Sequence, residues 1–570
     1  MCTAFALSIF AGRLVQLEGL DSAAYKTEAA QQLLKQIAIP AVRGDITTSD
    51  GTVLAMTVQT YTVFADPVKI PVAARSGVAA KLAGPLGLSA AAVLTMLNNP
   101  SSPDYVVLES GVSVTTGHRI SALELPGIDM TPSYTTKYPN ADLASNIVGF
   151  TSNRGSGTSL YGAQGLENEY NSVLAGRAGS EEVEVGAHNQ PIPLTEVKLS
   201  PGVPARSIRL TIQADIQYDA EQVCKQRVAQ THARNCSIIV LDPKTGAILA
   251  MAQWPTYNPN LPFSYGATTN ISTSDVFAPG STLKPVTVAA ALEKGGQLPM
   301  TAYTIPYQIT MDGQYTFHDA ESHPTVHYTI AGILAHSSNV GMVQVAQHIT
   351  PLEQYNYLRA FGLGSVSGLG LSAETRGLLP RPGSAGYWPD NRYEYAFGQG
   401  VGVTAIQMAS IYATIANGGV RVQPTLVAGT TNSAGKFTPA RRPATRRVIK
   451  QQTARDLMQM LQQVPAVDAQ AGENWGLMTG YTVAAKTGTA QVSEPGQGNC
   501  LCQYGSSYIG IAPADNPQLV VAVNIQDPRG KYYGDQVAGP AFYEVMKFAL
   551  QTMKIAPDYA RTPYIRLTAP

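Results

Sequence analysis

Residues 279–284 read Pro-Gly-Ser-Thr-Leu-Lys and open a stretch whose apolar spacing stays helical as far as residue 294. Pro-Gly ends an extended segment, so Ser281 is expected at or near the N-terminus of a helix. Ser281 and Lys284 are three positions apart and share one helix face. A serine hydroxyl needs a neighbouring base, and a lysine amine can serve when burial and nearby cations keep it neutral. The pair predicts a nucleophile and its base, although Ser-x-x-Lys alone occurs by chance in many helices.

A second candidate motif is Ser337-Ser338-Asn339, inside the range 326–348, whose apolar pattern predicts one long helix. Serine and asparagine side chains at that place can relay a proton and hold a substrate amide. The same residue types are also common helix caps. Taken alone, the triplet therefore favours a capping role over a chemical one.

The third motif is Lys486-Thr487-Gly488-Thr489, within an alternating stretch, 482–492, that predicts a strand. Glycine inside a strand costs stability and often marks a place where a ligand approaches the backbone closely. Lys486 and Thr487 would then face a carboxylate of that ligand. This motif, too, is weak evidence when it is considered alone.

The order of the three motifs is much more specific than any one of them. Penicillin-binding proteins and class A β-lactamases carry Ser-x-x-Lys, Ser-Asp-Asn and Lys-Thr-Gly in this order. Ser281 and Ser337 are 56 residues apart, and Ser337 and Lys486 are 149 apart, which is enough chain to fold a helical lobe between motifs and sheet. With its flanking sequence, the chain resembles a class B penicillin-binding protein along nearly its whole length.

Further segments outside the three motifs carry the same resemblance. Two groups of segments are similar to the pedestal of that class: Arg43-Gly-Asp-Ile46 with Asp50-Gly-Thr-Val-Leu-Ala55, and Gly165-Leu-Glu-Asn-Glu-Tyr170 with Leu174-Ala-Gly-Arg-Ala-Gly179. Phe397–Ala409 with Ala416-Asn-Gly-Gly419 is similar to its glycine-rich turn, and Tyr532–Phe542 is similar to its closing helix. No glycosyltransferase-like segment comes before the pedestal in this sequence, which favours class B over class A. Ala278 is a departure, because the family often has an acidic residue there.

The resemblance implies a role for each motif residue. Ser281 would be the acylated nucleophile and Lys284 its base, while Ser337 and Asn339 would transfer protons and hold the substrate. The strand that binds the substrate would be lined by Lys486, Thr487 and Gly488. The backbone N–H groups of Ser281 and Thr489 would form the oxyanion hole. The implied reaction attacks a D-Ala-D-Ala stem peptide of peptidoglycan, releases D-Ala and transfers the acyl group to an amine of a neighbouring strand. It uses no cofactor, and β-lactam antibiotics would trap its acyl-enzyme.

The order of predicted elements, strands then many helices then strands, indicates an α+β fold. With the resemblance, it predicts a mostly β or extended N-terminal pedestal and a transpeptidase domain with an antiparallel five-stranded sheet, flanking helices and a helical lobe. The expected ranges are 1–20 for the end of a truncated membrane anchor, 21–200 for the pedestal, 201–555 for the transpeptidase domain and 556–570 for a flexible tail.

Composition limits the classes of partner. Lys plus Arg and Asp plus Glu both number 39 in 570 residues, so no net field draws the chain to nucleic acid. The apolar run over 2–12 is too short to span a bilayer. The resemblance implies a cell-membrane protein with a single N-terminal anchor and an extracytoplasmic catalytic part. The pedestal and closing-helix sequences more closely resemble the septal, cell-division group of this class. The partners of that group are divisome membrane proteins and a polymerase of the shape, elongation, division and sporulation (SEDS) family.

Cysteine and histidine spacings leave several possibilities open. Cys224–Cys236 is the favoured disulfide because it would close a short loop between a helix and a strand, while Cys500 with Cys502 could form a strained bridge. Unpaired thiols are the alternative for either pair. The three histidines within residues 318–327 suit no familiar metal-ligand spacing, so no metal site is predicted.

Four other functions remain compatible with the motifs. A β-lactamase must hydrolyse its acyl-enzyme, and the Glu that class A enzymes use for this has no clear counterpart after Ser338. A D,D-carboxypeptidase is chemically close, but neither hydrolase needs the large first domain. A β-lactam sensor or a division scaffold could keep the same fold, and a sensor would also keep acylation of Ser281.

Overall fold

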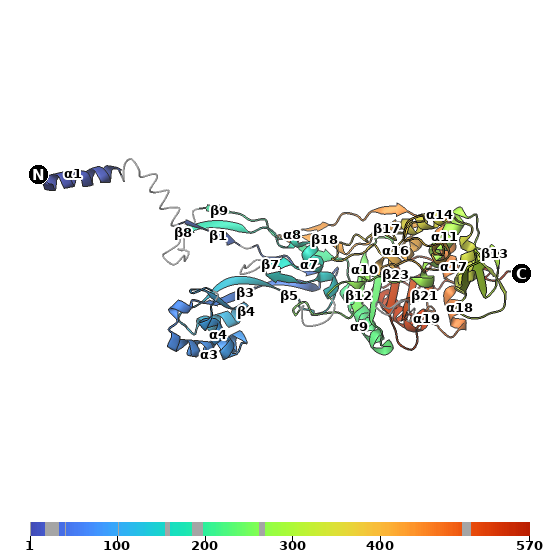
Figure 1. The fold of residues 1–570 in the computed structure, drawn as a ribbon, viewed down its shortest axis with the longest axis horizontal. Helices are drawn as coiled ribbons and strands as arrows, with labels where there is room; N and C mark the ends of the chain where they lie inside the picture. Colours follow the sequence, from blue (N-terminus) through green and yellow to red (C-terminus); the bar gives the residue numbers. More distant parts are fainter. Residues whose placement is uncertain are drawn as a thin grey trace.

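The computed structural model describes residues 2–16, 34–39, 41–100, 102–153, 160–184, 198–261, 268–492 and 503–569. The molecule is elongated, with the elements up to β9 at one end and those from β11 onward at the other (Figure 1). We call the first group the pedestal and the second the C-terminal domain.

The C-terminal domain is built on a five-stranded antiparallel sheet in the order β12-β11-β23-β22-β21. Its strands are β11 Asn235–Leu241, β12 Ile248–Trp254, β21 Ala484–Val492, β22 Gln503–Ala512 and β23 Leu519–Gln526. This confirms the predicted sheet, and β21, which carries the third motif, lies at its edge.

Both faces of this sheet are covered by helices, which explains why β11, β12 and β23 are apolar along most of their length. Along β11, Ile238 and Val240 pack into one core with α9 (Ala214–Thr231) and α20 (Gly539–Thr552). The alternate residues Ile239 and Leu241 pack into a second core with α16 (Ala405–Ala416).

The second core continues into a helical lobe that carries the first two motifs. Its central helix is α11 (Lys284–Lys294), which packs against α13 (Asn339–Ala346), α14 (Pro351–Phe361) and α17 (Gln451–Leu461). All eight residues over 284–291 of α11 are buried, and Lys284 is among them. The lobe therefore forces a lysine into an apolar interior.

The pedestal has a separate small core. Strands β3 (Val53–Ala65), β4 (Val106–Ser113) and β5 (Ile128–Lys137) pack with α3 (Arg75–Leu86) and α4 (Ala90–Asn98). The Asp-Gly turn at residues 50–51 joins β2 (Ile46–Thr47) to β3 in an antiparallel pair.

One sheet crosses the joint between the two parts. Strand β10 (Ser207–Leu210) pairs in parallel with β2 and antiparallel with β18 (Val427–Thr431), which comes from the middle of the C-terminal domain. Two segments that carry the family resemblance also meet near the joint: buried Arg43 donates to the carboxylate of Glu167 at 2.7 Å. The shared strands hold the pedestal against the C-terminal domain, and the ion pair joins two segments within the pedestal.

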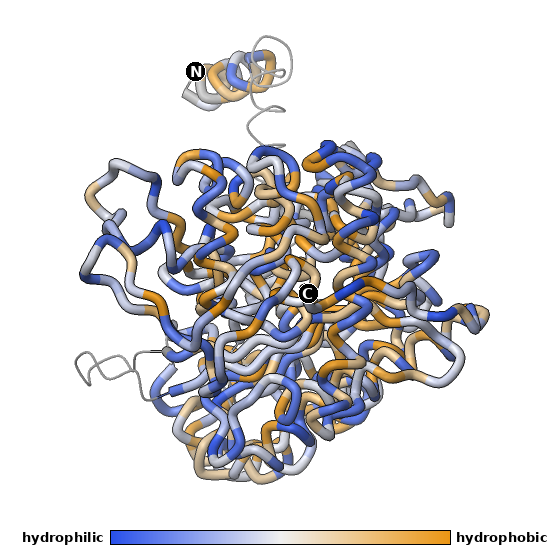
Figure 2. Tube along the Cα trace, turned by 90° about the vertical axis from the view of Figure 1, so that its right-hand side faces the viewer, coloured by the Kyte–Doolittle hydropathy of each residue, from blue (hydrophilic) through white to orange (hydrophobic). Residues whose placement is uncertain are grey.

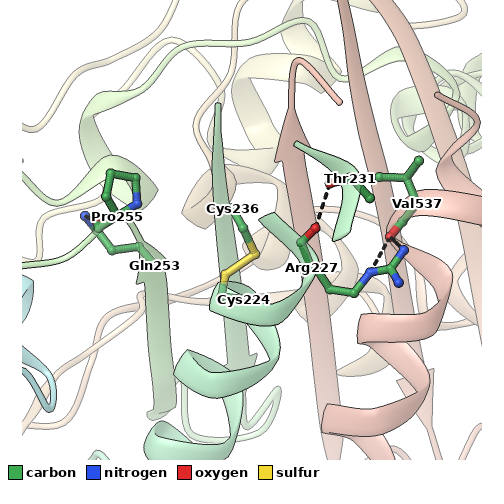
Figure 3. The surroundings of a disulfide bond; sticks show 7 residues. All are labelled: Cys224, Arg227, Thr231, Cys236, Gln253, Pro255 and Val537. Carbon is green, nitrogen blue, oxygen red and sulfur yellow. Dashed lines mark hydrogen bonds between the residues drawn. A yellow bond between two sulfur atoms is a disulfide. The ribbon is translucent and has the colours of Figure 1, made fainter. Parts of the chain in front are cut away.

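A disulfide joins Cys224 in α9 to Cys236 in β11, as favoured from the sequence (Figure 3). Nearby, Arg227 of α9 donates to the carbonyl of Val537 at 2.8 Å, just before α20. The bridge and this bond tie α9 to the sheet and to the C-terminal helix. Cys500 and Cys502 lie outside the described residues.

Helix α1 (Cys2–Val15) stands apart from the body in both views (Figures 1 and 2). Large apolar side chains on it are exposed, namely Phe5, Leu7, Ile9, Phe10, Leu14 and Val15. Within the described part of the chain, no helix combines the length and hydropathy needed to cross a bilayer.

The C-terminal segment, residues 556–569, differs from the flexible tail predicted from its prolines. Asp558 accepts hydrogen bonds from the backbone and hydroxyl of Thr482, just before β21. Thr329, before α12 (Ile330–Ala335), donates its N–H to the carbonyl of Leu567 at 2.9 Å. Ile565 and Leu567 also pack against the main core. The segment is held in place because it accepts hydrogen bonds from backbone N–H groups before β21 and before α12.

Removing residues 556–570 is therefore expected to lower the thermal midpoint of the C-terminal domain by several degrees. The lost hydrogen bonds contribute about 1 kcal/mol each, and charged acceptors such as Asp558 contribute more. Calorimetry of the truncated and full chains measures the effect. Tyr564→Ala is the matched control, because that side chain is 91% exposed, and it should leave the midpoint unchanged. Equal midpoints for the truncated and full chains would contradict the docked tail.

Candidate active site

Ser281 lies in a tight 3-10 turn, Gly280–Leu283, which runs directly into α11. The turn is held from several sides: Gly280 donates to the carbonyl of Gly398 at 3.0 Å, and Tyr412 donates to the carbonyl of Thr282 at 2.9 Å. Gly280 has φ +54°, a left-handed conformation in which glycine carries no steric penalty. The placement of Ser281 at a helix start, predicted from Pro-Gly, is confirmed.

Lys284 is completely buried, and its Nζ faces the second motif. It donates to Asn339 Oδ1 at 2.8 Å, to Ser337 Oγ at 3.3 Å and to the carbonyl of Ser337. Burial holds the pKa of Lys284 well below its ordinary value, and the positive charge of Lys486 adds to this effect. Asp319 opposes it by favouring the charged form. This setting favours the neutral amine, which is the form of lysine that can accept a proton.

The second motif interrupts the helix that the pattern predicted over 326–348. The structure has strand β16 (Val326–Thr329), helix α12 and helix α13, with Ser337 between the helices at φ +59°. A left-handed serine cannot continue an α-helix, so the prediction of one continuous helix was wrong. The break turns the Ser337 carbonyl and side chain toward Lys284, whereas Ser338 caps α13 by accepting from Gly341 N at 2.8 Å.

The third motif lies on β21, and its residues alternate between two sides of that strand. Thr487 and Thr489 line the cavity next to Ser281. Lys486 is fully buried, and its Nζ donates to the carbonyl and hydroxyl oxygens of Thr487, both at 3.2 Å. Burial lowers the pKa of Lys486 to about 8, against the opposing charges of Asp468 and Asp535. Lys486 therefore supplies positive potential from behind Thr487.

Gly488 allows another segment of the chain to pack closely against β21. A Cβ built on this residue would lie 2.4 Å from Ser507 Oγ, 2.9 Å from the Pro279 carbonyl oxygen and 2.9 Å from Thr282 Cγ2. The missing side chain thus lets the nucleophile turn sit directly against β21. The sequence identified the special position correctly, and the approach of a ligand to it stays a prediction.

Gly488→Ala should slow acylation of the protein by a fluorescent penicillin about 10-fold to 100-fold. The methyl group would push the nucleophile turn from the strand, and displacements of about 1 Å at a reacting group can cost that much. Rapid-mixing fluorescence measures the rate. Gly77→Ala in α3 is the matched control, because nothing lies within 4 Å of its added Cβ, and it should not change the rate. Equal rates for wild type and Gly488→Ala would refute the packing argument.

The three motifs meet at one cavity of about 450 Å³. Among the residues that line it are one or more from every motif: Ser281, Ser337, Ser338, Asn339, Thr487 and Thr489. Lys284 lies just beneath this surface, since it bonds the exposed turn at Ser337 and Asn339. A hydroxyl, a buried amine and the edge strand therefore converge on a space large enough for a peptide end.

Sequence reasoning missed several residues that line the same cavity. They are Asp319, His323, the stacked pair Tyr328 and His336, Phe397, Asp468, Tyr533 and Asp535. Burial raises the pKa of Asp468 to about 7, so this carboxyl stands close to a change of charge at neutral pH. Two signals could have found part of the set, because Phe397 and Tyr533 lie in segments already noted for their family resemblance.

Those two resembling segments contact the first and third motifs. Gly398, in the glycine-rich turn, lies so close to Gly280 that an added Cβ would come within 2.0 Å of the Gly280 carbonyl oxygen. Gly534, before the closing helix, donates to Thr489 Oγ1 at 3.0 Å. Each segment thus fixes a wall of the cavity. In the described ranges, His, Cys, Asp and Glu side chains form no group of three or more that could bind a metal ion.

Two protein families match the chain in sequence. The family "Penicillin binding protein transpeptidase domain" matches residues 236–547, which include every motif residue of the cavity. The family "Penicillin-binding Protein dimerisation domain" matches residues 38–210. Together they cover the C-terminal domain and the pedestal.

Similar proteins share almost the whole chain. Penicillin-binding protein PbpB of Mycolicibacterium smegmatis is 32% identical, over 97% of this chain and 89% of its own. Peptidoglycan D,D-transpeptidase FtsI of Escherichia coli K12 is 29% identical, over 98% of this chain and 92% of its own. Penicillin-binding protein 3 of Mycobacterium tuberculosis, solved with ampicillin, is 28% identical with a TM-score of 0.71, covering 94% of this chain and 100% of that structure.

Proposed function

This chain belongs to the class B penicillin-binding proteins and is a serine-type peptidoglycan D,D-transpeptidase, and from this premise we propose how its own residues carry the reaction. Ser281 is the nucleophile, Lys284 is its base, and Ser337 with Asn339 holds that base in place. The observation that carries the assignment is the buried amine of Lys284, bonded to the second motif and lying under the cavity that Ser281 lines.

Acylation would begin when neutral Lys284 takes the proton of the Ser281 hydroxyl and the oxygen attacks the carbonyl between two D-Ala residues. The negative charge that develops on the carbonyl oxygen would be stabilised by the backbone N–H groups of Ser281 and Thr489. As the C–N bond breaks, the departing D-Ala amine would receive a proton through Ser337. The acyl-enzyme and free D-Ala remain.

Deacylation would repeat these steps with an amine of a neighbouring stem peptide in place of the departing D-Ala. That amine would attack the ester carbon, lose a proton to Lys284 and release Ser281. In the acylation step that comes first, Thr487 and Thr489, which line the cavity, would hold the terminal carboxylate of the donor peptide, and Lys486 would favour that anion from behind the strand. The cross-link that results is an amide between two stem peptides.

β-Lactams would enter the same route and stop after acylation, because a ring-opened β-lactam stays tethered and blocks the incoming amine. The related M. tuberculosis protein has been solved with ampicillin and with aztreonam. We propose that this chain binds both compounds through Ser281.

A product assay distinguishes the transpeptidase from a sensor or a hydrolase on the same fold. The protein is supplied with peptidoglycan stem peptides, with and without an added amine acceptor, and products are separated by mass spectrometry. We expect D-Ala release together with an acceptor-dependent cross-link. Release of D-Ala without any cross-link would indicate a D,D-carboxypeptidase. Rapid turnover of penicillin would indicate a β-lactamase, and stable acylation without peptide turnover would indicate a sensor.

We also propose a septal role, in complex with divisome membrane proteins and a SEDS-family polymerase. The similarity to E. coli FtsI supports the septal assignment. None of the described pedestal residues lines the cavity, and the pedestal has its own core and exposes Val68 and Val72 at 73% and 76%. If that surface binds the polymerase, Val68→Asp with Val72→Asp should abolish co-purification of the polymerase and leave penicillin labelling intact. Unchanged co-purification would count against this surface.

The proposed arrangement at the membrane is a single N-terminal anchor with the catalytic part outside the cytoplasm. The anchor would include residues 1–20, followed by a pedestal over 21–200 and a transpeptidase domain over 201–555. Exposed apolar side chains on α1 and the disulfide between Cys224 and Cys236 support it, since disulfides persist in oxidising compartments. Protease added to intact cells should degrade the C-terminal domain, and full protection there would refute this topology.

A further inference from the structure

The turn that carries the second motif has an unusual backbone conformation, which neighbouring groups must stabilise. Ser337 is not glycine, yet it has φ +59° between helices α12 and α13. Non-glycine residues in this conformation persist where the surroundings fix them. The neighbours of this turn should therefore include a group that fixes it.

That group is Asp319, which follows strand β15 (Tyr315–His318) and is only 7% exposed. Its Oδ1 accepts from the backbone N–H of Asn339 at 2.5 Å and of Val340 at 2.9 Å. Ser338 Oγ donates to Oδ2 at 2.8 Å, and His323 Nε2 donates to the same oxygen at 2.9 Å. One carboxylate thus satisfies the first amides of α13 and its cap.

The residues that Asp319 fixes are those that hold the base. Asn339, whose N–H bonds Asp319, uses its side-chain oxygen to accept from Lys284 Nζ at 2.8 Å. Ser337, which is next to Ser338, contacts the same amine with its carbonyl and hydroxyl. Building on the proposed function of Ser281 and Lys284, we propose that Asp319 is a positioning residue that holds the Ser337–Asn339 turn against the catalytic amine.

Asp319 acts on Lys284 in two ways that can be separated. Its hydrogen bonds set the place of Asn339, and its negative charge favours the protonated amine. Lys486 from β21 acts in the opposite direction, while Asp468 and Asp535 face Lys486, and His323 pairs with Asp319. Loss of the Asp319 charge alone would keep Lys284 neutral to a lower pH, and loss of the bonds would slow acylation at every pH.

Asp319→Asn tests the proposal, with acylation by a fluorescent penicillin measured across pH. The amide keeps the shape of the carboxylate but places N–H donors against the N–H groups of α13. We expect the plateau rate to fall about 10-fold to 100-fold, as for a misplaced catalytic group, and the acid limb of the profile to move to lower pH. Active-site titration gives the fraction of competent protein, so that rates refer to folded enzyme.

A second variant keeps the test decisive if Asp319→Asn folds poorly. Ser338→Ala removes one donor and leaves the charge, so its plateau should fall by less and its acid limb should not move. Glu353→Gln is the control, since it alters a carboxylate capping a different helix, α14, and should not change the profile.

An unchanged plateau in Asp319→Asn, or a lower rate that only reflects the folded fraction with an unmoved limb, would overturn the proposal. Failure of the proposed function would look different, because the wild-type protein itself would then not be acylated.

Discussion

Ser281→Ala is expected to abolish covalent labelling by a fluorescent penicillin. The reason is chemical: the ester bond forms on the hydroxyl oxygen of Ser281, which lines the cavity together with Thr487 and Thr489 of the edge strand. The measurement is the intact mass of the protein after incubation with the antibiotic. Wild type should gain the mass of one ligand, and the variant should gain none.

The control for this variant is Ser384→Ala, which changes an exposed serine outside the cavity and should label like wild type. Circular dichroism of Ser281→Ala checks that its fold is retained. The removed hydroxyl is small and lies at a half-buried position, so a stable variant is expected. Full labelling of a folded Ser281→Ala protein would mean that another residue is the nucleophile.

Lys284→Ala should lower the acylation rate by about 10²-fold to 10⁴-fold, which is the usual contribution of a general base. In wild type, the rate should rise with pH as Lys284 loses its proton, and this limb should lie well below 10.5, the ordinary pKa of lysine. The sign follows from burial and from Lys486, which both disfavour the charged amine. Rapid-mixing measurements across pH check both statements.

Lys294→Ala is the matched control, because this lysine ends the same helix but is exposed. It should have the rate and pH profile of wild type. An acid limb that is identical in wild type and in Lys284→Ala would show that Lys284 is not the base, even if the variant were slower.

The sequence predicted the parts of the site that depend on local pattern. Pro-Gly before Ser281 indicated a helix start, the alternation around Lys486 indicated a strand, and both are found with bounds close to those expected. The order of the motifs also predicted that they would converge on one cleft, because together they are typical of one fold. Cys224 and Cys236 were paired correctly because a short loop separates a helix from a strand.

The errors arise where distant contacts override local pattern. Apolar spacing alone cannot show that Ser337 is left-handed, since Asp319 and Lys284 stabilise that break from other segments. Asp319 itself has no local signal for this role, because the α13 groups that it binds lie about 20 residues further along and only the folded turn brings them together. The prolines near the C-terminus suggested a loose tail, but backbone groups at Thr329 and Thr482 bind it.

A crystal structure of the protein acylated by ampicillin would test the convergence of the three segments most directly. The account predicts an ester on Ser281 Oγ, with the carbonyl oxygen about 2.7–3.1 Å from the N–H groups of Ser281 and Thr489. The carboxylate of the ligand should lie against Thr487 and Thr489, and Lys284 should keep its bond to Asn339. An adduct on another residue, or a carbonyl oxygen turned away from both N–H groups, would contradict it.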